Sequence, residues 1–256
     1  MKKWGILFSL ILSGLSSTSY AENAPWTEDQ ARLLPSHRWE GGIFSPLRYG
    51  INDSLELETR PLAFFIIPNL AAKIKLEKQG SWSIASKHSL HIPTFLLRSL
   101  SGEGSAKLLP LNSKIPFMLS IGTGIVGTTQ IASSPHFLSV ESGFLITPRF
   151  GDADFPELEL PFLYLRTASY HVPVSVKGSL TLEGRLVYDF YYSLQQTGML
   201  APGYGNGAFA LEHSGKVMWR PHENFELMAG VIATLNRYPR QTRLNLFPLF
   251  DIRFAF

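Results

Sequence analysis

Three things are missing from this sequence of 256 residues: cysteine, a long apolar run and an excess of one charge. Without cysteine the chain can form no disulfide framework, no Cys-ligated zinc or iron–sulfur site and no lipid anchor on a mature N-terminal cysteine. No run reaches the roughly 18 apolar residues of a transmembrane helix. The formal net charge of +3 leaves no broad basic surface for nucleic acid. Yet the mean hydropathy, +0.06, is high for a soluble domain, and the fold has to account for that.

The first residues have the layout of a secretory signal peptide. Two lysines follow the initial methionine, residues 6–15 are apolar, and a Ser-x-Ala sequence ends at Ala21. The apolar run is too short to cross a bilayer, which favours a cleaved signal over the alternative of an interfacial helix. We therefore expect a signal peptide over residues 1–21 and one mature domain over 22–256, with a net charge that falls from +3 to +1 when the two lysines leave.

Apolar and polar residues alternate with a period of two through most of the mature chain, whereas helical spacing is scarce. Residues 179–192 show this most clearly, because Leu180 and Leu182 share one face while Thr181 and Glu183 share the other. The pattern predicts strands over 39–49, 54–64, 69–78, 81–91, 115–127, 137–147, 160–170, 179–192, 206–219, 224–236 and 243–256.

Bacterial membrane barrels have an even number of strands, and the alternation predicts an odd number. Residues 28–38 or 92–114 could supply a further strand, or two predicted segments could form a single strand. Residues 22–38 are accordingly either an N-terminal extension or the first strand. Pro248 lies inside the last predicted strand, where a residue without an N–H predicts an edge position or a bulge.

The predicted connections differ in length. Those at 52–53, 79–80 and 221–224 are tight, whereas 92–114, 148–159 and 193–205 are long and polar or rich in Gly and Pro. Short turns at one end and long loops at the other are typical of a membrane barrel, in which a strand of on the order of ten residues crosses the apolar layer. Residues 92–114 are too apolar for a solvated loop, so we expect them to fold against the wall or into its mouth as a short helix.

The C-terminal segment ends in alternating apolar residues, at Phe250, Ile252, Phe254 and Phe256. This pattern resembles the C-terminal signature of Gram-negative outer-membrane β-barrel proteins, and the turn over 49–57 (YGINDSLEL) is similar to their periplasmic turns. The resemblance implies an all-β fold with a single antiparallel transmembrane β-barrel of about 10–12 strands. It also implies localisation in the outer membrane, contact with outer-membrane lipid, and a last strand that the barrel-assembly machinery reads.

The sequence contains few candidates for catalysis or ligand binding. Glu212, His213 and Ser214 combine the residue types of a hydrolase triad, but adjacent strand residues point to opposite faces, so His213 cannot share a face with its neighbours. Residues 122–127 match G-x-G-x-x-G, but they lie in a predicted strand without the following helix that cradles a diphosphate. Dispersed histidines offer no metal site. We therefore expect no catalytic residue, metal or cofactor.

The polar faces of the strands remain. If the apolar faces meet lipid, charged residues of both signs line the lumen: Glu56, Glu58, Lys73, Lys75, Glu141, Glu183, Arg185, Asp189, Arg243, Asp251 and Arg253. They either pair in a plugged barrel or line an aqueous path. The leading hypothesis is thus a structural or small-solute channel protein, porin-like and without catalysis. The alternatives are an outer-membrane enzyme acting on lipid or peptide, and a soluble periplasmic β-barrel or sandwich that binds a ligand. Nothing in the sequence indicates an oligomeric state.

Overall fold

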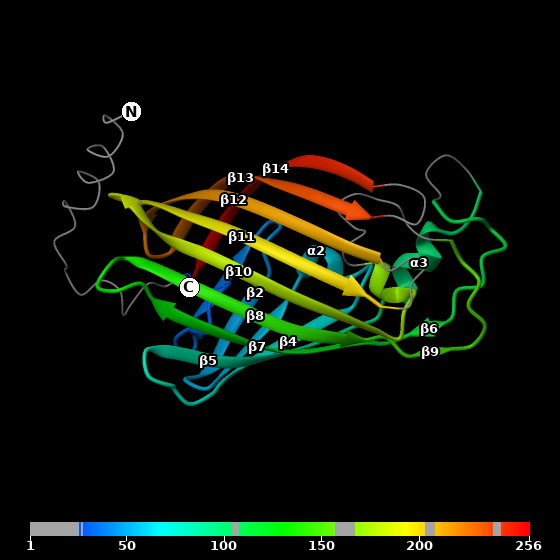
Figure 1. Cartoon of the computed structure of the whole chain (residues 1–256), viewed down its shortest axis with the longest axis horizontal. Coiled ribbons are helices and arrows are strands. Elements are labelled where there is room, and N and C mark those ends of the chain that lie inside the picture. Colours follow the sequence, from blue (N-terminus) through cyan, green and yellow to red (C-terminus); the bar gives the residue numbers. More distant parts are fainter. Residues whose placement is uncertain (1–25, 27, 104–107, 157–166, 203–207, 238–241) are drawn as a thin grey trace.

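The computed structural model describes Trp26 and residues 28–103, 108–156, 167–202, 208–237 and 242–256, and it is a closed antiparallel barrel (Figure 1). The predicted signal peptide lies outside these residues. Neighbours around the ring follow the order β1-β14-β13-β12-β11-β10-β8-β7-β5-β4-β3-β2. The barrel strands are β1 (Trp39–Gly42), β2 (Leu47–Asn52), β3 (Leu55–Thr59), β4 (Asn69–Lys75), β5 (Trp82–His91), β7 (Ser120–Gln130), β8 (His136–Ile146), β10 (Val174–Val187), β11 (Phe190–Ala201), β12 (Ala208–His222), β13 (Phe225–Arg237) and β14 (Thr242–Ala255).

The wall has an apolar outer face and a polar inner face. Along β10, Leu180 is 48% exposed while Thr181 is 1% exposed, and the alternation recurs on the other long strands. Exposed apolar side chains such as Val140, Leu194 and Val231 cover the outside. A soluble β-sandwich would turn these residues inward to form its core. The outward apolar face therefore explains the mean hydropathy and excludes the predicted alternative of an apolar core between two sheets.

The all-β antiparallel barrel is confirmed, with differences in individual strands. The strand predicted over 54–64 ends at Thr59, because Pro61–Phe64 form a helix, and the strand predicted over 115–127 is divided into Phe117–Met118 and Ser120–Gln130. The predicted strand over 39–49 is two strands, β1 and β2. The predicted strand over 179–192 passes through a turn at Tyr188 and Asp189, so the loop predicted over 193–205 is mostly β11. The strand predicted over 160–170 is wrong where it is described, since Ala168–Tyr170 form the 3-10 helix η2, and residues 160–166 lie outside the described residues. Neither 28–38 nor the described residues of 92–114 (92–103 and 108–114) add a strand to the barrel.

Long connections gather at one end of the barrel, on the right in Figure 1. They contain α3 (Thr94–Leu100) and a two-stranded sheet of β6 (Phe117–Met118) and β9 (Arg149–Phe150), whereas α2 (Pro61–Phe64), in the connection between β3 and β4, lies nearer the middle of the barrel in Figure 1. The expected short helix in 92–114 is thus confirmed as α3. Leu97 of α3 packs with Leu109, Met118 and Tyr170, so loops that are distant in sequence share one apolar cluster. No helix among the described residues is long and apolar enough to cross a membrane.

The wall is low on one side. Strands β1 to β4 contain four to seven residues, whereas β10 to β14 contain 12 to 15. On that side β14 pairs with β1 only from Arg253 to Ala255, while its pairing with β13 runs without a register shift from Thr242 to Phe254. Pro248 therefore lies in a strand without a bulge, and the predicted edge position is the one observed.

Candidate functional site

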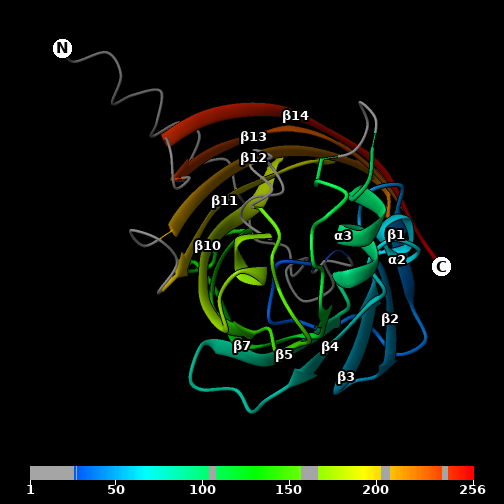
Figure 2. The same cartoon turned by 90° about the vertical axis from the view of Figure 1, so that its right-hand side faces the viewer.

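The lumen contains the chain's own N-terminal segment, defined here as Trp26 and residues 28–35 (Figure 2). Its hydrogen bonds reach strands on opposite sides of the ring, so the segment crosses the lumen. The Leu34 N–H donates to Glu56 of β3 (2.9 Å), and on the far side Gln195 of β11 donates to Asp29 (3.3 Å). Further bonds join the Ala31 N–H to Thr128 (2.8 Å), Lys73 to the Arg32 carbonyl (3.4 Å) and Gln30 to Glu183.

The N-terminal segment lies near the end that carries the short turns. Leaving the lumen at Pro35, the chain passes over β2 at Gly50, where an added Cβ would collide with the Pro35 carbonyl oxygen. His37 adopts a positive φ of 64° and donates its N–H to the Gly50 carbonyl (2.7 Å). This turn leads directly into β1, so the position of the segment is tied to the first strand of the wall.

A chain of buried ion pairs crosses the low wall beneath the N-terminal segment. The Arg48 guanidinium bridges Glu40 (3.0 Å) and Glu56 (2.7 Å), and Lys73 reaches Glu56 at 3.4 Å. All four side chains are almost completely buried, and they come from β1, β2, β3 and β4 as neighbours in the sheet. Because buried charges are stable only when paired, this chain of charges fixes the four short strands relative to one another.

A second charged cluster holds the start of the N-terminal segment. Arg253 of β14 binds Glu226 of β13 at 2.9 Å and Glu28 of the segment at 3.3 Å, while Arg220 of β12 binds Glu226 at 2.6 Å. Burial alone would raise the pKa of Glu28, but the positive charges of Arg253 and Lys216 outweigh it and lower that pKa to about 2. Glu28 therefore remains a carboxylate at neutral pH and an electrostatic anchor of the segment.

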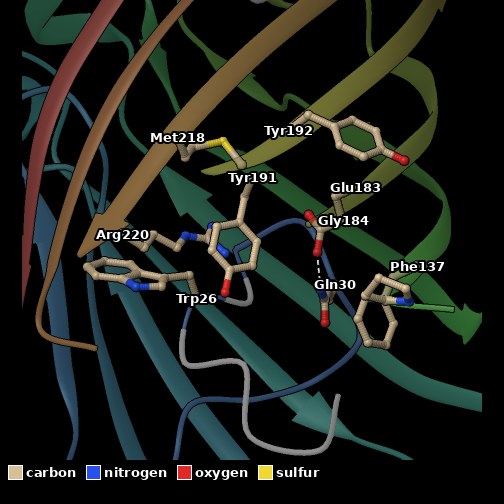
Figure 3. A pocket seen from close by; sticks show the side chains of 10 residues that line it. Trp26, Gln30, Phe137, Glu183, Gly184, Tyr191, Tyr192, Met218 and Arg220 are labelled. Carbon is tan, nitrogen blue, oxygen red and sulfur yellow. Dashed lines mark hydrogen bonds between the residues drawn. The ribbon is translucent and has the colours of Figure 1, made fainter. Parts of the chain in front are cut away.

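A small pocket separates the N-terminal segment from the wall of β8, β10, β11 and β12 (Figure 3). Trp26 and Gln30 line it from the segment, and Arg220 lies 4.4 Å from the Tyr191 ring centre and 6.0 Å from that of Trp26. The indole N–H of Trp26 and the side-chain oxygen of Gln30 are buried here without a hydrogen-bond partner among the described residues. Buried polar groups are normally hydrogen-bonded, so this side of the segment is polar rather than a packed apolar core.

The inner wall beyond the N-terminal segment remains polar. The Glu141 carboxylate of β8 forms ion pairs with Lys87 of β5 (2.7 Å) and Lys177 of β10 (3.3 Å). All three side chains are partly exposed to solvent. Ser139 and Thr197 lie on the same inner face, but their side chains are buried, and Ser139 shares a hydrogen bond (2.8 Å) with Thr128, which Ala31 of the N-terminal segment contacts. The solvent-accessible polar groups here are therefore the charges of the Lys87–Glu141–Lys177 cluster, which suit water and polar solutes.

The eleven residues predicted to line the lumen occupy different environments. Glu56, Lys73, Glu141, Glu183 and Arg253 lie on the inner wall and make the contacts given above. Asp251 is buried, and its carboxylate accepts hydrogen bonds from the backbone N–H groups of Ile43, Phe44 and Ser45 at 2.7–3.1 Å. These bonds fix the connection between β1 and β2.

The others lie nearer the strand ends. Glu58 is 4.0 Å from Arg60, Lys75 ends β4 in an exposed position, and Arg243 is exposed at the start of β14. Arg185 donates to the Tyr188 carbonyl at the turn. Asp189 is exposed within that turn and belongs to no strand, because the chain reverses where a continuous strand was expected.

Sequence reasoning missed the residues that organise this site. Glu40, Arg48 and Glu226 are central to the ion pairs and were not named as lumen residues, although all three lie within predicted strands. For Arg48 the signal was clear. Alternation with Tyr49 and Leu47 gave a signal for its inward orientation. Glu28 and Asp29 precede all predicted strands and have no periodic pattern, so nothing local indicated that they enter the lumen.

The candidate triad does not assemble. Glu212 and Ser214 are buried on the inner face of β12, whereas His213 is exposed on the outer face. Residues 122–127 lie in β7, a strand that leads into β8 rather than into a helix. Within the described part of the chain, no group of three His, Asp or Glu side chains is arranged to bind a metal.

No protein-family model matches the chain, and no curated protein matches its sequence. Among solved structures it is similar to OccAB2 of Acinetobacter baumannii, with 12% identity and a TM-score of 0.43 over 82% of this chain and 53% of that one. It is similar to the KdgM porin solved with disordered oligogalacturonate (10%, TM-score 0.45, 86% and 96%) and to the outer membrane protein OprD of Pseudomonas aeruginosa (10%, TM-score 0.43, 90% and 62%). The chain spans about half the length of OccAB2. At this level of similarity, function has to follow from the chain's own wall and lumen.

Proposed function

We propose that this protein is an outer-membrane β-barrel that acts as a small-solute channel without catalysis, closed at its short-turn end by the N-terminal segment. The observation that carries the proposal is the inversion of the wall: apolar outside, and hydroxylated and charged inside. Lipid on the outside and water on the inside is the environment in which this arrangement is stable.

The wall supports a channel because the pairing between its strands does not depend on the N-terminal segment. The segment's described hydrogen bonds to barrel strands use wall side chains and take nothing from the ladder between strands. If the segment left, Arg253 would keep Glu226, and Arg48 would keep Glu40 and Glu56. Departure of the segment therefore breaks a few contacts, among them the pair between Asp29 and Lys216 of β12 (3.9 Å), and leaves the ion pairs between wall strands in place.

Export and assembly complete the proposal. The predicted signal peptide over 1–21 would deliver the chain across the inner membrane. The residues expected to be read by the barrel-assembly machinery, Phe250, Ile252, Phe254 and Phe256, belong to β14 and the residue after it, and three of them are strongly exposed on the outer face. We assign their exposure to contact with the machinery during assembly and with lipid afterwards.

Planar-bilayer recording tests the channel. In the cysteine-free chain, Ala31→Cys with Thr128→Cys places two thiols at a contact where backbone nitrogen and hydroxyl are 2.8 Å apart. We expect the oxidised pair to conduct poorly, its reduced form to resemble the parent, and deletion of 26–34 to give a large conductance. A second pair, Lys114→Cys with Asp154→Cys, joins two loop residues outside the lumen and controls for the disulfide itself.

The outcomes separate the parts of the proposal. If the deletion variant folds, as judged by heat-modifiable gel mobility, and still passes no current, the channel function is wrong. If the parent already conducts as well as the deletion variant, and oxidation of the Ala31–Thr128 cysteine pair changes nothing, the channel stands but the N-terminal segment does not close it.

A further inference from the structure

The wall is too low on one side to span a bilayer with strands. At about 3.3 Å per residue and a tilt of about 40°, the five residues of β3 rise about 13 Å and the seven of β4 about 18 Å. The 14 residues of β10 rise about 35 Å, against an apolar layer of about 25 Å. The low section of the wall, β1 to β4, therefore ends within the depth of the apolar layer.

Beside this low section, β14 has an open edge, defined as residues 242–250. Phe256 exchanges hydrogen bonds with Trp39, and the Ile252 carbonyl accepts the Ile43 N–H, so even-numbered residues direct their backbone groups toward β1. Of the strands that the structure describes, only β1 faces this edge, and it ends at Gly42, opposite Arg253. The edge above that point has no partner strand.

Pro248 keeps this edge unpaired. It is an even-numbered residue, so its nitrogen faces the missing partner and has no hydrogen to donate. Proline within an edge disfavours the addition of a further strand from another chain. The open edge is therefore unsuited to pairing with a second protein strand, and it leaves an interruption in the side of the barrel.

The inner face next to the open edge carries apolar side chains at consecutive inward positions. Phe247 and Leu249 of β14 lie opposite Ile232 and Gly230 of β13, and Met228 follows on the same inner face. On the low side, the residues that follow β1 and β3 expose Phe44, which is 67% exposed, and Phe65, which is 88% exposed. Apolar side chains thus continue from the outer surface, past the interruption, into the lumen.

Toward the long-loop end, the same inner face becomes polar and cationic. Arg243 is exposed there, and the Asn245 side-chain nitrogen is buried without a hydrogen-bond acceptor among the described residues. The sequence of inner residues along β14 is therefore cation, amide donor, aromatic ring and aliphatic chain. This order matches an anionic headgroup followed by an acyl tail.

We propose that the interruption between β14 and the low section is a lateral entrance for an anionic single-chain amphiphile. The acyl tail passes from the bilayer to the inner face at Phe247, Leu249 and Ile232, and the headgroup lies at Arg243 and Asn245. This inference rests on the membrane placement of the proposed function, but it concerns a different solute and a different route.

Photochemical labelling tests the entrance. The refolded full chain, in vesicles containing a palmitic acid analogue with a diazirine in its tail, is irradiated, and the modified residues are assigned by mass spectrometry. We expect labels on outward residues such as Leu180 and Leu194 and also on inward Phe247 and Leu249, with none on inward Lys177, whose side chain is 52% exposed. Labels confined to outward residues would overturn the lateral entrance. Absence of labels on outward residues too would show that the membrane placement is wrong.

Two pairs of variants sharpen the test. Leu249→Asn should at least halve labelling of Phe247, whereas Phe250→Asn, its outward neighbour, should leave it unchanged. Arg243→Gln should weaken inner labelling by the free acid and spare that by its methyl ester. The proposed route would be contradicted if Leu249→Asn and Phe250→Asn had equal effects. The proposed headgroup site would be contradicted if the free acid labelled the Arg243→Gln variant as strongly as the parent.

Discussion

The buried ion pairs of the low wall give a quantitative prediction. Arg48→Met keeps most of the side-chain volume but removes the cation between Glu40 and Glu56, both almost completely buried. Removing one partner of a buried pair typically costs about 3–5 kcal/mol. Glu56 keeps Lys73 at 3.4 Å and Glu40 keeps Arg38 at 3.1 Å, so we expect the lower end, about 3 kcal/mol. This corresponds to a change of roughly a hundredfold in the folding equilibrium.

Urea unfolding in vesicles, followed by tryptophan fluorescence, measures this free energy. Lys177→Met is the matched control, because it also removes a cation from a carboxylate that keeps another, Lys87 at 2.7 Å from Glu141. The Lys177 side chain is 52% exposed, so the control should cost less than about 1 kcal/mol. Equal effects of the two variants would refute the argument that burial makes the Arg48 pairs essential.

Three further outcomes follow from the structure. Gly50→Ala should displace the N-terminal segment, because the new Cβ meets the Pro35 carbonyl, and single-channel recording should show a larger open fraction; an unchanged open fraction would contradict the close approach. His213→Ala should leave the outer-membrane lipid composition of the producing cells unchanged, since His213 points away from Glu212 and Ser214; an altered lipid profile would revive the enzyme hypothesis. Deletion of Phe256 should reduce the amount of heat-modifiable barrel in the outer membrane without preventing refolding in detergent. If the variant and the parent reached the same amount in cells, the assembly machinery would not recognise this residue.

Alternation revealed the two faces of the wall because burial on a strand repeats every second residue. It failed where the repeat carries no information about a turn. Across the two-residue turn at Tyr188 and Asp189, Val187 pairs with Phe190, and the register then shifts between Arg185 and Val187, so that Gly184 pairs with Tyr192. This shift keeps even-numbered residues of both strands on one face, and the pattern looks like one strand. Glycine, which favours such turns, is absent there, and Tyr188 adopts the positive φ of 46° itself.

The N-terminal segment was beyond prediction for a different reason. Its partners are wall side chains far away in sequence, such as Glu183 for Gln30 and Thr128 for Ala31. Nothing local in residues 28–35 repeats with the period of a strand or helix, because the wall rather than the segment satisfies their hydrogen bonds. The ion pairs share this limit: the charges were visible, but their partners depend on the register between strands.

The measurement that most directly tests the central claim is aqueous labelling of single cysteines on the two faces of β10. With the protein refolded in vesicles, a charged maleimide that does not cross lipid should react with Lys177→Cys on the inner face and leave Leu180→Cys on the outer face unmodified. Both should react after unfolding. Rapid modification of Leu180→Cys in the folded, vesicle-bound protein would show that the apolar face meets water, and the membrane barrel would then be wrong.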